Sequence, residues 1–357
     1  MQARALKDRG HDVKIFGRFT DYFSRDKFYK LKSSVTVATG LGPSPLEAIR
    51  DFKPDIVHVH NLFPNWGTTW VEDLEVPLVV TVHNFRPVCS AGTMLRKGSF
   101  CDLCPTKGSH NAVLHACYRS SRLATVPLAI ASKKKSRPLL FQKAAALIFL
   151  SSRSKAIYES IGKASSTQSY FIPNFVKPYA VPETEKENDQ CAPWVYVGRL
   201  SEEKGILELI RGWPHDASLE VLGDGPLMEQ CVSAASGKKV AFYGLATSEQ
   251  VAESLKGARG FIFPSLCTEM SALSYLEALA SGTPTLAFSG NSVADDVAQA
   301  GTGIVFDDFQ DLDNGLAQIE SQYSSLARAS RERFASQYSE KVWTKKIEEL
   351  YQSVCSI

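Results

Sequence analysis

The clearest hydrophobic pattern in the chain runs from residue 260 to residue 288. The apolar run Gly260–Phe263 predicts a buried strand, and a polar loop that ends at Glu269 follows it. Apolar residues then return at helical spacing, at Leu273, Leu276, Leu279 and Ala280. Gly282-Thr283-Pro284 ends this helix, and residues 284–288 predict the next strand. The pattern is typical of a strand–loop–helix–strand unit in a parallel sheet.

The same alternation covers the whole second half of the chain. Apolar runs that predict further strands begin near residues 193, 219, 240 and 303. Helical patterns separate these runs, and strands that alternate with helices favour a doubly wound parallel sheet. Residues 334–351 have the spacing of a final helix.

The first half carries a second set of such elements. Helices are expected over residues 1–10 and 44–52, and strands over 13–17, 54–60, 76–83, 144–150 and 171–174. The polar stretch 182–190, PETEKENDQ, predicts a linker. A chain of 357 residues fits two domains of this kind.

Charged side chains stand near the ends of two predicted strands in the second half. Arg199 follows the strand near residue 193, and Lys204 stands where the next helix begins. Two cations at a strand-to-helix junction suit a phosphate-rich ligand. Glu269 and Glu277, with seven residues between them, stand just before and within the later helix. The first amides of that helix also suit a diphosphate. Solvated surface charge is the alternative for both glutamates.

The order of these motifs resembles the nucleotide-binding domain of GT-B glycosyltransferases, specifically the retaining family 4. The motifs are WVYVGRLSEEKG, then LEVLGDGP and VAFYG, and last the Glu-x7-Glu pair. The phrase RALKDRGHDVKIFG, residues 4–17, resembles the first helix and second strand of a GT-B N-terminal domain. The resemblance implies an α/β fold with two Rossmann-like doubly wound domains.

The resemblance also predicts the domain boundaries. Residues 1–176 would form the acceptor-side domain, with a cysteine-rich insert at 89–117. Residues 191–333 would bind the nucleotide sugar, and the helix in 334–357 would cross back to the first domain. The first strand of the N-terminal domain and its glycine-rich loop are missing, so we expect an N-terminal sheet without one central member.

Individual residues take roles from the same resemblance. Glu269 and His83 are the expected catalytic residues, because both would contact the donor sugar. Arg199 and Lys204 would neutralise the diphosphate, and Glu277 would hold the ribose hydroxyls. The other expected donor-binding residues are Gly198, Gly244, Leu245, Met270, Ser271 and Ala272.

Two observations leave alternatives at this site. A satisfied structural histidine is the alternative for His83, and for His60 at the end of the preceding predicted strand. The run 270–272, Met-Ser-Ala, stands where the family often has Gly or Pro and Phe. Its side chains would change the choice of sugar or weaken binding.

The predicted function is therefore a retaining glycosyltransferase of the hexosyltransferase type. It would move a sugar from a nucleotide-diphosphate sugar to a glycan or lipid-linked acceptor in cell-surface polysaccharide synthesis. The family generally needs no catalytic metal, so none is expected. The alternatives are a non-catalytic nucleotide-sugar-binding or scaffold protein of GT-B fold, and a sugar-nucleotide epimerase.

The net charge of +2 hides a strong division along the chain. Residues 1–178 hold 26 Lys and Arg against 12 Asp and Glu, whereas the remainder holds 14 against 26. A basic first half favours an anionic partner, and no nucleic-acid-binding motif is present. A membrane surface or lipid phosphate is therefore the expected partner, with ordinary solvated charge as the alternative.

The expected location follows from what the sequence lacks. No apolar run is long enough to span a membrane, and the N-terminus has no apolar signal-peptide core. We expect a cytoplasmic protein that contacts the inner face of the cell membrane. Residues 118–143 combine basic and apolar residues as an interfacial segment does, and a core-packed helix is the alternative.

Four of the eight cysteines lie close together in the sequence. Cys89, Cys101, Cys104 and Cys117 fall within 29 residues. Four thiolates suit a closed structural zinc site, for which His110 and His115 are substitute ligands. Free thiols, or a disulfide or redox role, are the alternatives.

Overall fold

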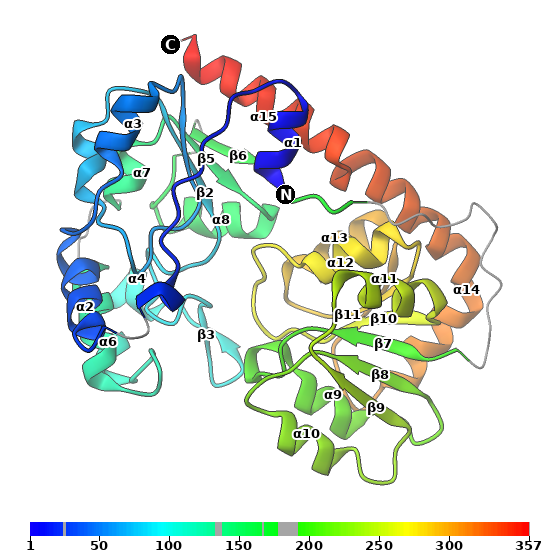
Figure 1. Cartoon of the computed structure of the whole chain (residues 1–357). Helices are drawn as coiled ribbons and strands as arrows, with labels where there is room; N and C mark the ends of the chain where they lie inside the picture. Colours follow the sequence, from blue (N-terminus) through cyan, green and yellow to red (C-terminus); the bar gives the residue numbers. More distant parts are fainter. Residues whose placement is uncertain (24–25, 133–137, 166–167, 178–191, 357) are drawn as a thin grey trace. The chain divides into compact units, whose positions relative to one another are not determined.

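The computed structural model describes residues 1–23, 26–132, 138–165, 168–177 and 192–356. It divides into two compact units (Figure 1). The first contains Met1–Met94, Phe100–Ile172 and Thr344–Ile357, and the second contains Leu95–Ser99 and Pro173–Trp343. The predicted linker at 182–190 lies outside the described residues. No helix among the described residues is long and apolar enough to cross a membrane.

The second unit is built on one parallel sheet. Its strands are β7 (Trp194–Val197), β8 (Leu219–Leu222), β9 (Val240–Gly244), β10 (Gly260–Phe263), β11 (Thr285–Phe288) and β12 (Gly303–Phe306). They lie in the order β12-β11-β10-β7-β8-β9, and every adjacent pair is parallel. All six strands predicted for this half of the chain are therefore confirmed.

Side chains that alternate along these strands supply a core on each face of the sheet. Trp194 and Tyr196 of β7 pack into one core, whereas Val195 between them packs into the other. Both faces must be covered, because parallel strands of this kind are apolar on both sides. Helices α9, α10 and α14 supply one core, and α11, α12 and α13 supply the other (Figure 1).

The helices of the second unit follow the strands in regular alternation. Their bounds are α9 (Ile206–Gly212), α10 (Met228–Ala234), α11 (Ser248–Gly257), α12 (Leu273–Ala280), α13 (Ser292–Ala300) and α14 (Leu312–Arg333). The helix predicted over 334–351 is confirmed over residues 340–351, but it does not run unbroken from Phe334. Residues Phe334–Tyr338 form a π-helical turn, Ser339 has extended backbone, and α15 (Glu340–Cys355) begins after it.

The first unit holds a smaller parallel sheet. Its strands are β1 (Val57–Val59), β2 (Leu78–Val82), β5 (Ala146–Phe149) and β6 (Ser169–Phe171), in the order β1-β2-β5-β6. The predicted strand at 13–17 is wrong, because residues 11–19 have no regular secondary structure. A strand needs a hydrogen-bonded neighbour, and the described part of this sheet ends at β1.

Short helices surround this sheet. They are α1 (Gln2–Asp8), α2 (Tyr29–Thr39), α3 (Leu46–Phe52), α4 (Leu103–Lys107), α5 (His110–Leu114), α6 (Arg122–Ala131), α7 (Leu139–Lys143) and α8 (Ser152–Ser160). A hairpin of β3 (Leu95–Arg96) and β4 (Ser99–Phe100) lies in the cysteine-rich insert. The 3-10 turns are η1 (Thr20–Phe23) and η2 (Thr69–Asp73), with η4 (Glu202–Lys204) in the second unit.

Candidate active site

The strand order of the second unit marks one place for a ligand. From β7 the chain moves outward through β8 and β9, then returns to the other side of β7 as β10. The direction of winding therefore reverses between β7 and β10. Loops that leave these two strands diverge, and the crevice beyond their carboxyl ends is where such sheets bind ligands.

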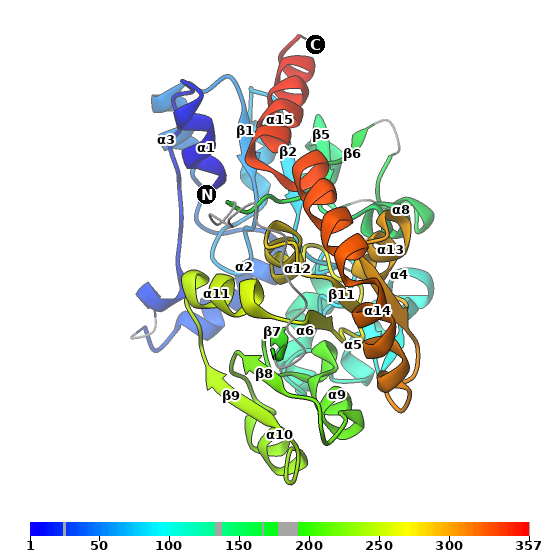
Figure 2. The ribbon, with the colours of Figure 1, turned by 90° about the vertical axis from the view of Figure 1, so that its right-hand side faces the viewer.

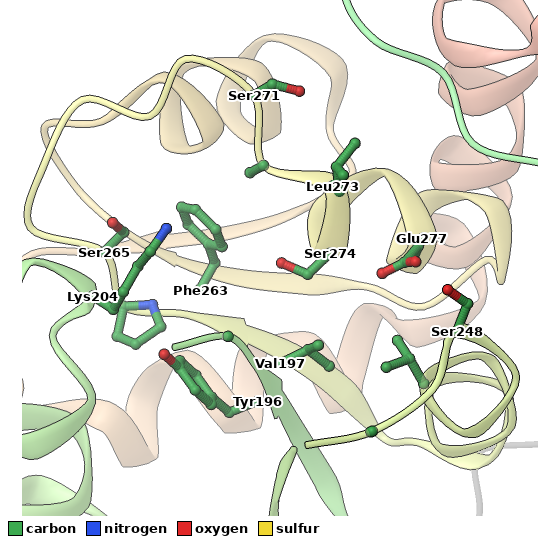
Figure 3. A pocket seen from close by; sticks show the side chains of 15 residues that line it. Tyr196, Val197, Lys204, Ser248, Phe263, Ser265, Ser271, Leu273, Ser274 and Glu277 are labelled. Carbon is green, nitrogen blue, oxygen red and sulfur yellow. The ribbon is translucent and has the colours of Figure 1, made fainter. Parts of the chain in front are cut away.

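A cavity of about 390 Å³ lies in this crevice. It is lined from β7 and β10, from the turn after β7, and from the starts of α11 and α12 with the residues just before them, as far as Glu277 on α12 (Figure 3). Lys204 and Glu277 lie at opposite ends of the cavity in this view, with Ser274 between them. The cavity therefore offers a cation at one end, a carboxylate at the other and hydroxyl groups between.

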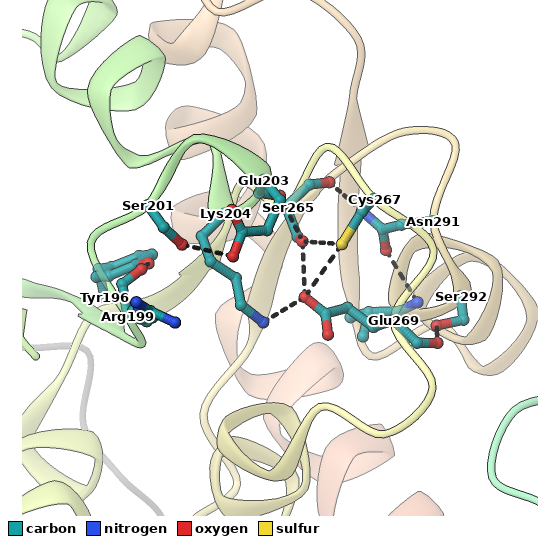
Figure 4. Close-up of polar contacts among 11 residues, drawn as sticks. Tyr196, Arg199, Ser201, Glu203, Lys204, Ser265, Cys267, Glu269, Asn291 and Ser292 are labelled. Carbon is teal, nitrogen blue, oxygen red and sulfur yellow. Dashed lines mark hydrogen bonds and ion pairs between the residues drawn. The ribbon is translucent and has the colours of Figure 1, made fainter. Parts of the chain in front are cut away.

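Lys204 and Glu269 form the central ion pair of the site (Figure 4). The Lys204 Nζ donates to Glu269 Oε1 at 2.5 Å, and the Ser265 hydroxyl donates to the same oxygen at 2.8 Å. Burial lowers the pKa of Lys204, but the Glu269 carboxylate outweighs that effect and the pKa is raised overall. The lysine is therefore held as a cation at the mouth of the crevice.

A glycine allows this lysine to approach the end of β10. Gly205 has φ +66°, and a Cβ there would lie 2.1 Å from the carbonyl oxygen of Pro264. Any side chain would push the turn after β7 away from the loop after β10. The Lys204-Gly205 pair thus brings the cation and the Glu269 loop together.

The loop that carries Glu269 is fixed by the start of α13 (Figure 4). The Asn291 amide donates to the carbonyl oxygens of Ser265 at 2.8 Å and Phe288 at 2.7 Å. Its side-chain oxygen also caps the first turn of α13. The Ser292 hydroxyl donates to the Glu269 carbonyl oxygen at 2.6 Å. These bonds hold the backbone of the loop at both of its ends.

Glu277 differs from Glu269 in its surroundings. It lies on the second turn of α12 and lines the cavity. The one cation among the cavity-lining residues, Lys204, lies at the other end of the cavity. Burial raises the pKa of Glu277 from 4.5 to about 7. A carboxylate in this state gains from any ligand that donates hydrogen bonds to it.

The cavity collects five of the predicted site residues of this unit. They are Gly198, Lys204, Ser271, Ala272 and Glu277. Glu269 is not itself a lining residue, but it is bonded to Lys204 and Ser265, which are. The other predicted residues that do not line the cavity are Arg199, Gly244, Leu245 and Met270. Arg199 and Leu245 are exposed, and Met270 is buried in the loop beneath.

Sequence reasoning missed several residues that line the cavity. Ser265, Ser248 and Ser274 supply hydroxyl groups, and Tyr196 and Phe263 supply apolar surface. A signal existed for Ser265, which directly follows a predicted strand and a proline. Ser248 and Ser274 carry no such signal, because serine is common near the starts of helices, where it can cap the first turn.

His83 lies in the first unit, within a group of three histidines. It follows β2 directly, and His60 follows the neighbouring parallel strand β1. The Nε2 of His83 lies 3.0 Å from the Nδ1 of His60, and the rings of His60 and His58 are stacked. Burial lowers the pKa of all three, that of His60 to about 4 with a further contribution from His83, although His60 keeps an exposed face. They are therefore neutral at physiological pH.

The four cysteines of the insert are half-buried, and Cys104 lies near the other three. Burial and the neighbouring Cys89, Cys117 and Cys101 raise the pKa of Cys104 to about 12. Within the described ranges, no group of three or more His, Cys, Asp or Glu residues is arranged to hold a metal ion. Zinc therefore stays a prediction, in which metal binding would draw the four thiols together.

Solved structures share this architecture over most of the chain. Sucrose-phosphate synthase from Thermosynechococcus elongatus superposes with a TM-score of 0.69 at 17% identity, over 99% of this chain and 92% of that one. Anabaena Alr3699/HepE, solved with UDP, gives 0.59 at 15% identity, over 86% and 80%. S. aureus TarM gives 0.56 at 15% identity, over 86% and 58%. These matches confirm the predicted GT-B fold with two Rossmann-like domains.

Curated relatives match at higher identity over shorter segments. Sulfoquinovosyl transferase SQD2 of Arabidopsis thaliana is 24% identical over 279 residues, which are 76% of this chain and 50% of that protein. The uncharacterized glycosyltransferase MJ1607 of Methanocaldococcus jannaschii is 29% identical over 140 residues, 37% of this chain and 34% of that protein. The chain thus spans half or less of the length of these relatives.

Two family profiles cover the two halves of the chain. Residues 1–178 match Glycosyltransferase Family 4, and residues 182–338 match Glycosyl transferases group 1. The crevice with Lys204, Glu269 and Glu277 lies within the second match. The chain therefore belongs to the family 4 (group 1) glycosyltransferases.

Proposed function

We propose that this protein transfers a sugar from a nucleotide-diphosphate sugar, with retention of configuration, to a glycan or lipid-linked acceptor in cell-surface polysaccharide synthesis. The observation that carries the proposal is the crevice at the β7–β10 switch point. It combines a half-buried cation, a paired carboxylate and a second carboxylate of raised pKa. HepE and TarM were solved with UDP, which makes UDP-sugars the first donors to test.

Each charged group in the crevice has a proposed task. The diphosphate would take Lys204 as its counter-ion, and the amides that open α12 would add donors. Lys204 now pairs with Glu269, so a bound diphosphate would free that carboxylate for the sugar hydroxyls. Glu277 would accept from the ribose hydroxyls at the far end. His83 would contact the sugar, and the exposed Arg199 would reach the phosphates on donor binding.

The proposed chemistry relies on charge rather than on a protein nucleophile. When the bond between sugar and diphosphate breaks, negative charge grows on the leaving oxygen. Lys204 and Arg199 would stabilise that charge in the transition state, which lowers the barrier. The acceptor would attack from the face that the diphosphate leaves, so configuration would be retained.

The test is a thermal-shift titration with UDP-, GDP-, dTDP- and ADP-sugars, followed by product analysis with the active donor. A ligand that binds only the folded state raises the melting temperature. We expect one nucleotide class to raise it, Lys204→Ala and Glu277→Ala to abolish the shift, and Glu229→Ala on α10 to leave it intact. No shift with any donor would contradict the proposal.

Product analysis separates the proposal from the two alternatives. A transferase releases free nucleoside diphosphate when an acceptor is added, and Glu269→Ala should bind donor but release none. A non-catalytic binder would give the thermal shift without any release. An epimerase would convert the sugar nucleotide without an acceptor, and would contradict the assignment.

We also propose that the first unit contacts an anionic membrane from the cytoplasmic side. Helices α2 and α6 pack side by side (Figures 1 and 2), and both expose apolar side chains. We define the apolar helix face as Leu31, Val35, Leu123, Val126 and Ile130, which are 37–85% exposed.

Charge supports a lipid partner for this face. Between Asp102 and Glu159 the sequence has ten Lys and Arg and no acidic residue. Of these, Arg119 is exposed just before α6, and Arg122 is exposed in its first turn. Apolar side chains with basic neighbours are what binding to an anionic bilayer requires.

Vesicle co-sedimentation tests the membrane contact. The chain should bind vesicles of phosphatidylglycerol and phosphatidylcholine, and Leu123→Glu with Val126→Glu should reduce the bound fraction about tenfold or more. Val232→Glu on α10 is the matched control, because Val232 is 51% exposed in the other unit. Equal binding by the α6 variant, or a dimer in solution that buries this face, would contradict the contact.

A further inference from the structure

We infer that His60 is a positioning residue that fixes one tautomer of His83. This inference rests on the proposed function, in which His83 contacts the donor sugar. His60 itself would touch no substrate. It would act through its hydrogen bond to the His83 ring.

The geometry of the pair is set by the sheet. β1 and β2 are parallel neighbours, with His58 beside Val79 and Val59 beside Val80. The residues that follow the two strands therefore leave the same edge. Their rings meet with centroids 5.2 Å apart, and His60 Nδ1 lies 3.0 Å from His83 Nε2. This contact is within the range of a hydrogen bond.

A hydrogen bond between two neutral imidazoles allows only one proton between them. If His60 donates, His83 must carry its own proton on Nδ1 and offers a donor there. If His83 donates from Nε2, its Nδ1 is an acceptor. In the described part of the chain, the Nδ1 of His83 makes no hydrogen bond, so it is the nitrogen left for a ligand. The partner at Nε2 thus decides what His83 offers to a sugar hydroxyl.

The ring of His60 is itself held in place from behind. It stacks on His58 with ring centroids 4.4 Å apart. His58 is fixed at both nitrogens, by the Tyr351 hydroxyl at 2.6 Å and the Thr81 hydroxyl at 2.7 Å. A support whose own orientation is restrained is what a positioning residue needs.

The experiment uses two substitutions at one position. His60→Phe keeps a ring to stack on His58 but removes the hydrogen bond. His60→Asn places an amide near the position of Nδ1, so a hydrogen bond to His83 can form again. His215→Phe is the control, because His215 is an exposed histidine of the second unit.

Nitrogen-15 NMR of histidine-labelled protein gives the readout that activity cannot give. The shifts of Nδ1 and Nε2 distinguish the two neutral tautomers, and His83→Asn assigns the signals. We expect a single His83 tautomer in the unsubstituted chain and in His215→Phe, a mixture in His60→Phe, and a single tautomer again in His60→Asn.

Kinetics with the active donor complete the test. We expect kcat to fall about tenfold to a hundredfold in His60→Phe, as when other orienting partners are lost, with recovery in His60→Asn. A single tautomer retained in His60→Phe would overturn the inference, and so would a mixture with unchanged kcat. Failure of the proposed function appears separately, as the absence of any donor-induced thermal shift.

Discussion

Glu269 stands on the loop before α12 and Glu277 stands within α12, and the two carboxylates have different partners. Glu269 has Lys204 at 2.5 Å, so its negative charge is compensated within the protein. Glu277 lies in the cavity with a pKa of about 7. Ionisation of Glu277 therefore lowers the stability of the folded chain until a ligand forms hydrogen bonds to its carboxylate.

The first prediction concerns the stability of the Glu277→Gln variant. The folded-state pKa of Glu277 lies above 4.5, so its contribution to stability is complete below pH 4.5 and is lost as pH rises through about 7. Replacement by Gln should therefore raise the free energy of unfolding at pH 8 by roughly 1–2 kcal/mol. Urea unfolding at pH 8 and pH 4.5 measures the difference, which should vanish at the lower pH.

A control variant and a donor-binding measurement complete the test of Glu277→Gln. Glu229→Gln, on the exposed surface of α10, should change stability at neither pH. Glu277→Gln should bind the donor more weakly in spite of its greater stability. A variant as stable as the unsubstituted chain at pH 8 would show that the carboxylate is well solvated.

For individual residues, the sequence predicted which charged groups form the site better than it predicted where each side chain lies. Lys204, Glu269 and Glu277 were predicted from charge at strand and helix ends, and the fold brings all three to one crevice. Leu245 and Arg199 are exposed and do not line the cavity. The sequence pattern does not specify side-chain rotamers, and these decide whether a residue on an outer turn reaches a ligand. The Lys204–Glu269 pair was also unforeseen, because sixty-four residues separate the two in sequence.

Among the elements, the start of α13 holds the Glu269 loop through two side chains, those of Asn291 and Ser292. Asn291 is fully buried and connects the cap of the helix to the carbonyl oxygen of Ser265. We predict that Asn291→Ala lowers the free energy of unfolding by about 2–3 kcal/mol, because buried partners lose their hydrogen bonds. Chemical denaturation measures this loss, with Asn314→Ala in the exposed first turn of α14 as the control.

Donor binding distinguishes a local effect of this change from a global one. If Asn291 positions the loop, Asn291→Ala should lose donor affinity at temperatures well below its own melting temperature. Retained affinity in the folded variant would mean that Ser292 and Ser265 hold the loop without it.

The cysteine-rich insert gives the third prediction. We expect the purified chain to contain about one zinc per molecule, and a chelator to lower its melting temperature by several degrees, because metal binding stabilises the folded state. Cys104→Ser should abolish both effects, whereas Cys355→Ser, at an exposed thiol outside the insert, should not. A metal-free chain whose melting is insensitive to chelator would favour free thiols.

Strands that the sequence marks as short apolar runs between helices were predicted well. The strand predicted at 13–17 was not, because its formation depends on a neighbouring strand to pair with. The six strands of the second unit were found, since each is a short apolar run between helices. Residues 13–17 have the apolar spacing of a strand, but pairing decides whether a strand forms, and pairing is not encoded locally. The break at Ser339 was missed because the apolar spacing continues through it.

For the molecule as a whole, charge divides along the chain. The first 178 residues carry a net charge of +14 and the rest −12. We predict that binding to anionic vesicles falls at least fivefold as salt rises from about 0.1 M to 1 M, because the Debye length shortens from about 10 Å to 3 Å. Co-sedimentation measures the bound fraction, and neutral vesicles serve as the reference. Binding that does not respond to salt would leave the apolar helix face as the sole basis of the contact.

The last helix has a consequence for how the chain folds during synthesis. Residues from Thr344 onward belong to the first unit, where Tyr351 contacts His58 and Glu348 binds both Arg9 and His11. The ribosome makes the rest of that unit first but releases this helix only after the whole second unit. The second unit can therefore finish folding while the first still waits for its closing helix. The half of the chain that is made first is the half that matures last.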